Sequence, residues 1–140
     1  MQKLIVKSLT ARGILDSRGN PTIEVDIAVR SESGAEAGVG RAAAPSGASR
    51  GKHEVIAFPE GGVDASVKAF KEILAPKLIG SPADRLEEVD SLLHELDGTP
   101  NFSRIGGNAA VAISMAVAKA AAAARDIPLY KHLGGEEAVQ

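Results

Sequence analysis

The stretch from residue 23 to residue 30 constrains the fold most, because its side chains alternate regularly. Four large apolar residues take every second position: Ile23, Val25, Ile27 and Val29. The positions between them are mostly polar: Glu24, Asp26, Ala28 and Arg30. This period of two is that of a β-strand with one buried face and one face in water. The chain therefore needs a sheet that is covered on one side only.

Two further strands are predicted on either side of this one. Residues 3–15 alternate more loosely and are followed by the turn formers of residues 15–22. A hairpin turn at 31–34 leads into a third strand over residues 35–43. Short turns between successive strands imply antiparallel pairing. The N-terminal third is therefore predicted to be a three-stranded antiparallel β-meander.

Apolar spacings after residue 62 predict helices. The first has one apolar face made of Val63, Val67, Phe70 and Leu74. Pro76 and Gly80 are predicted to end it. A second helix is predicted to start at residues 81–84, with Ser81 as its cap and Pro82 in its first turn. Gly98 is predicted to close this second helix.

The third predicted helix, from residue 108 to about 125, is apolar on all sides. Such a helix is buried on several sides. A membrane span is the rival interpretation, since the run is long. Ser114 and Lys119 interrupt it, and alanine contributes little to membrane insertion, so we reject a span. We expect one face of this helix on the sheet and another against a further partner.

Composition limits the function classes. A chain of 140 residues suits one domain. The net charge of −2 gives no electrostatic footprint for nucleic acid or an anionic membrane. The absence of cysteine excludes disulfides and thiolate chemistry and fits a cytoplasmic protein. The N-terminus lacks the pattern of a signal peptide.

Residues 44–53 form the one irregular stretch rich in functional groups. Gly47 and Gly51 allow close backbone approach to a ligand. Ser46 and Ser49 offer oxygens to a hard cation, and three basic residues follow between positions 50 and 53. The segment is fitted to close over an anionic, metal-bound ligand. The alternative is a flexible surface turn.

A series of motifs resembles the N-terminal domain of enolase. In chain order they are Leu15-Asp16-Ser17-Arg18-Gly19-Asn20-Pro21-Thr22, Pro45-Ser46-Gly47-Ala48-Ser49, Leu96-Asp97-Gly98-Thr99, Asn108-Ala109, Ala116-Val117-Ala118-Lys119-Ala120 and Pro128-Leu129-Tyr130. The resemblance covers nearly the whole chain. It implies an α+β fold, in which a three-stranded antiparallel β-meander is followed by a helical bundle packed on one face.

The resemblance also implies a parent activity. Enolase interconverts 2-phosphoglycerate and phosphoenolpyruvate plus water in glycolysis, and its superfamily uses a base with magnesium ions that stabilise an enediolate-like intermediate. In the family, the lysine base and the carboxylates of the first metal lie in a C-terminal barrel. We expect residues 1–140 to be the N-terminal capping domain without that barrel. No residue here is then catalytic, and the isolated domain is predicted to be inactive.

The site residues that the resemblance implies lie mostly in the irregular stretch. Ser49 matches the loop ligand of the second magnesium ion. Ser46, Gly47 and Ala48 match the lid over the substrate, and His53 lies at its edge. The implied partners are the substrate, the C-terminal barrel and, in a homo-oligomer, a second subunit.

Two charged positions outside the loop are also implicated. Arg12 and Glu24 match positions that form charge pairs across the family's dimer interface, although a solvated strand face would explain them equally well. Asp90 and His94 stand four residues apart, a spacing that metal pairs use. Neither lies in the apolar row of its helix, which favours a solvated face.

Other function classes stay open at this point. One is a non-catalytic, stand-alone interaction module with the same fold. Another is a divergent enolase-like protein, because Gly13, Arg50 and Gly106 depart from the family's usual residues and the segment 55–62 is short. A third, the capping domain of a more distant superfamily member, is disfavoured by the two serine-containing motifs.

Overall fold

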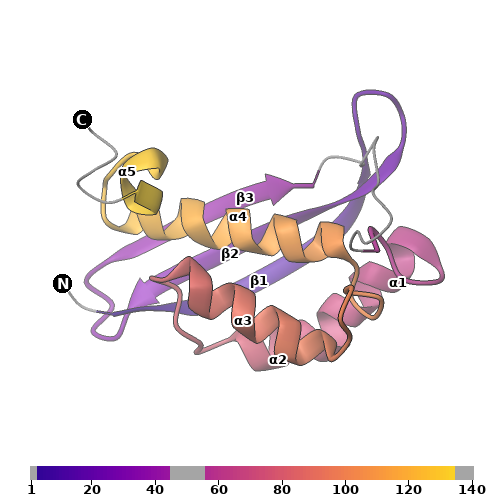
Figure 1. The fold of residues 1–140 in the computed structure, drawn as a ribbon. Helices are drawn as coiled ribbons and strands as arrows, with labels where there is room; N and C mark the ends of the chain where they lie inside the picture. Colours follow the sequence, from indigo (N-terminus) through magenta and orange to yellow (C-terminus); the bar gives the residue numbers. More distant parts are fainter. Residues whose placement is uncertain (1–2, 45–55, 135–140) are drawn as a thin grey trace.

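A computed structural model describes residues 3–44 and 56–134. Its sheet has three antiparallel strands in the order β1-β2-β3: β1 (Leu4–Leu15), β2 (Pro21–Ser31) and β3 (Ala37–Ala43). The helical segments that follow are α1 (Gly62–Ala69), a π-helical turn η1 (Phe70–Leu74), α2 (Ala75–Leu78), α3 (Leu86–Asp97), α4 (Gly107–Ala124) and α5 (Leu129–Gly134). The helices gather on one side of the sheet (Figure 1). The predicted α+β class is confirmed.

The alternation in β2 separates the two faces of the sheet. Its four large apolar side chains are exposed by 1% or less and form the centre of the core: Ile23, Val25, Ile27 and Val29. Glu24 and Asp26 lie on the opposite face and are half-buried. The pairing runs from Leu4 opposite Ser31 to Leu15 opposite Pro21. One sheet face therefore carries the helices and the other carries charges.

Glycines in β3 set how closely α4 approaches the sheet. A Cβ on Gly40 would lie 2.1 Å from the backbone oxygen of Ala116, and a Cβ on Gly38 would lie 2.3 Å from that of Ala120. Backbone therefore packs almost directly on backbone, which explains why the buried side of α4 is rich in alanine. α4 is long and apolar enough to cross a membrane by length and composition, but most of it is buried in this domain. That burial is typical of a core helix.

The prediction that Pro76 ends the first helix was wrong. The chain stays helical to Leu78, and the π turn at 70–74 comes just before the proline. In this turn the N–H of Ala75 reaches back to the carbonyl of Phe70. Proline has no N–H to donate, and its ring crowds the carbonyl four residues back. The wider π turn makes room for the ring, so the helix continues. Gly80, with φ +85°, follows its end.

The prediction that Ser81 caps a helix was also wrong, because residues 80–83 pair with the edge of β1 instead. The backbone oxygen of Ser81 accepts the N–H of Val6 at 3.0 Å, and the Ser81 hydroxyl donates to the Lys77 carbonyl at 2.9 Å. The helix begins only at Leu86. An edge strand has backbone groups that need partners. The hydrogen bonds to the edge of β1 therefore determine the structure of residues 80–83, and Ser81 does not cap a helix.

Candidate functional site

The predicted loop residues Ser46, Gly47, Ala48, Ser49 and His53 lie outside the described residues. What the structure describes is how the chain is held at each end of that segment. The first anchor is Ala44, which is buried at the end of β3. Its N–H donates to the backbone oxygen of Ile23 at 3.2 Å, and its carbonyl accepts the Thr22 hydroxyl at 2.6 Å. The chain therefore leaves the sheet at a fixed point.

The second anchor is Ile56, at the other end of the segment. Its N–H donates to the carbonyl of Asn101 at 2.8 Å, and its carbonyl accepts the N–H of Gly107 at 2.6 Å. The N–H of Asn108 donates to the carbonyl of Ala57 at 3.0 Å. These contacts join the segment to the first turn of α4. They also occupy N–H groups of that helix end, which would otherwise be open to an anion.

A buried carboxylate organises the turn that carries Asn101. Asp97, fully buried at the end of α3, accepts the N–H of Arg104 at 3.0 Å and that of Ile105 at 2.8 Å on Oδ1. Its Oδ2 accepts the N–H of Thr99 at 3.0 Å and also the Thr99 hydroxyl. Four hydrogen bonds thus fix residues 99–105 around one side chain. Sequence reasoning missed this role, although Asp97 belongs to one of the motifs quoted above.

Gly106 completes the anchor. Its φ is +91°, and a Cβ there would lie 2.8 Å from the carbonyl oxygen of Ala57. A larger residue would be strained by the backbone conformation and would push away the segment that it holds. The presence of glycine at position 106, noted above as a departure from the family's usual residue, therefore matches the geometry at this point of the chain.

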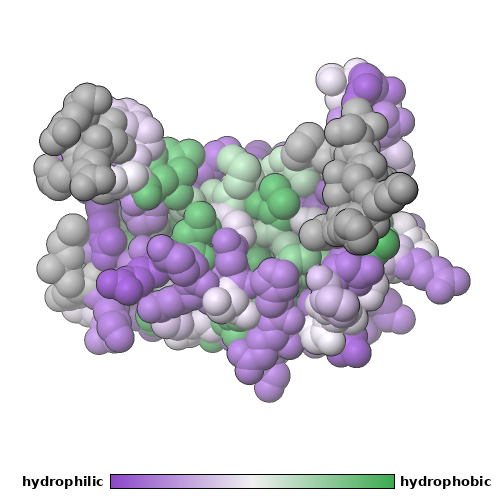
Figure 2. All heavy atoms as spheres, in the orientation of Figure 1, coloured by the Kyte–Doolittle hydropathy of each residue, from purple (hydrophilic) through white to green (hydrophobic). Residues whose placement is uncertain are grey.

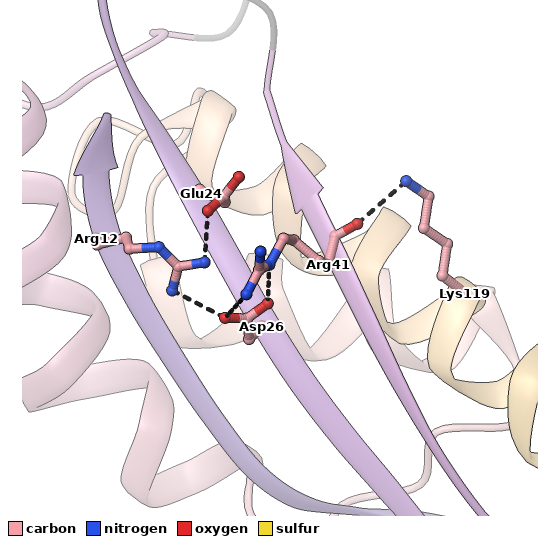
Figure 3. A network of polar contacts seen from close by, with 5 residues as sticks. All are labelled: Arg12, Glu24, Asp26, Arg41 and Lys119. Carbon is pink, nitrogen blue, oxygen red and sulfur yellow. Dashed lines mark hydrogen bonds and ion pairs between the residues drawn. The ribbon is translucent and has the colours of Figure 1, made fainter. Parts of the chain in front are cut away.

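Arg12 and Glu24 meet on the face of the sheet opposite the helices (Figure 3). Arg12 Nη2 lies 2.5 Å from Glu24 Oε1, and Arg12 Nη1 lies 2.9 Å from Asp26 Oδ2. Arg41 Nε lies 2.7 Å from Asp26 Oδ1. The two predicted residues are thus partners within one chain, in a network whose other members sequence reasoning missed. The register explains it, since Arg12 faces Glu24 and Asp26 faces Arg41 across the strands.

The network shifts the pKa values of Asp26, Arg12 and Arg41. The hydrogen bond from Arg41 is the largest cause that lowers the pKa of Asp26 below its ordinary value of 3.8, and Arg12 adds to it. Burial of the carboxylate opposes this shift. The pKa of Arg12 is raised by its hydrogen bonds to Asp26 and Glu24. The charged forms of Asp26 and Arg12 are therefore favoured.

Asp90 and His94 do not form a metal pair. The Asp90 carboxylate accepts a hydrogen bond from the Ser114 hydroxyl, and the His94 ring lies against that of Phe102 with 4.2 Å between ring centroids. His94 is exposed and Asp90 is half-buried, and both side chains line a hollow between α3 and α4. Across residues 3–44 and 56–134, no three His, Asp or Glu side chains gather as a metal centre would require.

Comparison with known families decides where the domain belongs. The family model described as "Enolase, N-terminal domain" matches residues 6–133. The chain belongs to the enolase N-terminal domain family. The match covers both anchors and all of the sheet and helices except the first two residues of β1 and the last residue of α5.

Curated relatives agree. Over 131 residues this enolase N-terminal domain is 50% identical to the enolase of Methanosphaera stadtmanae and 52% identical to that of Methanothermobacter thermautotrophicus. Each comparison covers 94% of the chain and 30% of the relative. The enolase of Pyrococcus furiosus is 48% identical over 140 residues, covering 95% of the chain and 31% of the relative. The chain therefore spans about 30% of the length of these enolases.

Proposed function

We propose that this chain is the substrate-covering N-terminal domain of an enolase, the magnesium-dependent lyase that interconverts 2-phosphoglycerate and phosphoenolpyruvate plus water. The observation that carries the proposal is the family match over residues 6–133, together with identities near 50% to proteins named enolase. The two anchors support it further, because they hold both ends of the segment that bears the family's lid motif.

The chemistry sets what the rest of the protein must supply. A proton beside a carboxylate is barely acidic, so its removal needs a base and cations in a dry site. The described residues do not fit a magnesium centre of their own, since no three suitable side chains gather. We therefore assign the base and the metal carboxylates to a C-terminal barrel, and no catalytic residue to this chain. Magnesium, when bound, supplies positive charge next to the substrate.

The chain's own part is to bind and to exclude water. Ser46, Gly47 and Ala48 would cover the substrate, with His53 at the edge of the cover, and Ser49 would offer oxygen ligands to magnesium. Residues 44 and 56 keep the two ends of this cover in place through backbone hydrogen bonds. Arg12 and Glu24 are proposed to contact a second subunit on the opposite side of the sheet.

The test is Ser49→Ala in the full-length polypeptide, with Ser91→Ala on the exposed side of α3 as the matched control. We expect the Ser49 variant to lose about 10- to 100-fold in kcat or in apparent magnesium affinity, the range typical of groups that support a metal. The control should behave as the parent. Unchanged turnover and magnesium dependence in the Ser49 variant would overturn the assignment, as would a full-length protein without this activity.

A further inference from the structure

The outer edge of β3 has no neighbouring strand in the part of the chain that the structure describes. The sheet order leaves β3 paired with β2 alone, whereas residues 80–83 bond to the outer edge of β1. β3 runs along the upper border of the domain in Figure 1, and Figure 2 shows apolar atoms across the middle of the helical side in the same orientation. The β3 edge is therefore a surface distinct from both sheet faces. Such an edge can serve as a template for pairing with another chain.

The hydrogen bonds at the two ends of β3 fix which backbone groups point outward. The N–H of Ala44 donates to the carbonyl of Ile23, and the carbonyl of Glu36 accepts the N–H of Ser31. Even-numbered residues therefore direct their backbone groups toward β2. In an antiparallel pair, successive residues point these groups alternately toward the neighbouring strand and away from it. The outward groups therefore belong to the odd-numbered residues Val39, Arg41 and Ala43.

One side chain from α4 contacts this edge. Lys119 Nζ donates to the carbonyl of Arg41 at 3.1 Å, in an exposed contact. Figure 3 shows Lys119 on the side of β3 that lies away from β2. The ammonium group has three donors and is strongly hydrated, so the donors that do not reach Arg41 keep their water. A strand that approached this edge would have to displace Lys119 and remove that water.

The close packing of α4 on β3 explains how Lys119 reaches the edge. A Cβ on Gly40 would lie 2.9 Å from the Cβ of Lys119, so the lysine side chain starts directly beside the backbone of β3. Among residues 3–44 and 56–134, no carboxylate forms an ion pair with Lys119. Its positive charge therefore stands uncompensated at the edge of the sheet within the described part of the domain.

The strand that fits this edge is β3 of a second copy. Two identical antiparallel edges related by a two-fold axis present matching donors and acceptors to each other. The side chains of β3 offer little obstruction, because its one long side chain, Arg41, pairs with Asp26 on the open sheet face. Val39 adds an apolar side chain that is 66% exposed. Pairing of two such edges would, however, bring two Lys119 ammonium groups out of water.

We propose that Lys119 prevents β3 from pairing with β3 of a second copy. It does so by occupying the outward carbonyl of Arg41 and by holding a hydrated positive charge where a second strand would lie. Lysine beside an open edge is one of the means by which proteins avoid edge-to-edge association. The proposal goes beyond the proposed function, because it involves neither the substrate nor the metal.

Amide hydrogen exchange in the full-length polypeptide tests whether the edge is open. The amides of Val39, Arg41 and Ala43 should exchange at least about a hundredfold faster than those of Gly40 and Ala42, which donate to β2. Equal protection of the two sets in dilute protein would overturn the proposal, because another part of the polypeptide or a subunit would then already cover the edge.

Substitution of the lysine tests its role. Lys119→Met keeps the length of the side chain and removes its charge and its donors, and Lys71→Met, exposed on η1, is the matched control. In sedimentation experiments we expect the Lys119 variant to form larger species at concentrations at least about tenfold lower than the parent does. The outward amides of β3 should gain protection in the same concentration range. The control and Lys119→Arg, which keeps a charged donor, should behave as the parent.

A second substitution tests where the new contact forms. Val39→Lys, added to Lys119→Met, returns a positive charge to the edge from β3 itself and should restore the association behaviour of the parent. Association that persists in the double variant would overturn the proposal, because it would arise from another surface. Unchanged association of Lys119→Met would also overturn it. So would a loss of protection throughout the domain in that variant, because the lysine would then be required for the fold itself.

Discussion

Gly40 of β3 lies directly against the backbone of α4, so that a Cβ on Gly40 would stand 2.1 Å from the carbonyl oxygen of Ala116. The atoms that it would meet are backbone, which cannot swing away as a flexible side chain can. We predict that Gly40→Ala destabilises the domain by about 1–3 kcal/mol, the usual cost of overpacking a close contact. Urea unfolding measures this, with Val39→Ala, exposed on the same strand, expected within about 0.5 kcal/mol of the parent. Equal stabilities for both variants would contradict the contact.

The second prediction concerns Asp97. Asp97→Asn keeps the size of the side chain but replaces one carboxylate oxygen with an NH₂ group. In the parent, both carboxylate oxygens accept hydrogen bonds from backbone N–H groups, and one also accepts from the Thr99 hydroxyl, so the NH₂ group would face donors. We expect a loss of about 1–3 kcal/mol in the free energy of unfolding, typical of a buried donor left without its acceptor. Asp64→Asn, exposed in the first turn of α1, is the control. Hydrogen exchange should also show faster loss of protection at Ile56 in the Asp97 variant alone.

The third prediction is the pH dependence of the network on the open sheet face. The pKa of Asp26 lies below its ordinary value, chiefly because Arg41 donates to the carboxylate. Because the pKa of Asp26 is lower in the folded state than its unfolded value of 3.8, the ionised carboxylate stabilises the fold at pH values above 3.8. This stabilisation is lost as the pH falls through the pKa of the folded state. Carboxyl NMR titration should show this low pKa, and Arg41→Gln should raise it. Arg30→Gln, farther along the same face, should not.

The fourth prediction concerns self-association of the full-length polypeptide. If Arg12 and Glu24 contact a second subunit, Arg12→Glu places like charges on that interface and should weaken association by about tenfold or more. Arg30→Glu, on the neighbouring strand β2, is the matched control. Analytical ultracentrifugation measures both. An Arg12 variant that associates as the parent does would mean that the pair acts only within its own chain.

Hydrophobic periodicity predicted the structure correctly where the sequence of one element is enough to determine it. The alternation from Ile23 to Val29 predicted a half-buried strand, and the structure confirms it. The signals around Ser81 misled because a cap is a local preference, whereas the open edge of β1 needs partners for its backbone. Pro76 misled for a similar reason, since the π turn before it resolves the clash.

The candidate site was predictable only in part. The Arg12–Glu24 pair was selected by resemblance, but Asp26 and Arg41 join it only through cross-strand register, which a sequence does not display. Asp97 stands in a recognised motif, yet its role depends on how the turn of residues 99–105 folds around it. The lid residues Ser46 to Ser49 and His53 lie outside the described residues, so their roles stay predictions.

The most direct measurement is turnover of 2-phosphoglycerate by the purified 140-residue chain, with and without magnesium, beside the full-length polypeptide at equal concentration. The account assigns the base and the metal carboxylates to the C-terminal part of the polypeptide. It therefore predicts no phosphoenolpyruvate above background from the 140-residue chain and magnesium-dependent turnover from the full-length protein. Magnesium-dependent turnover by the 140-residue chain alone would contradict it, because the catalytic base would then lie within these residues.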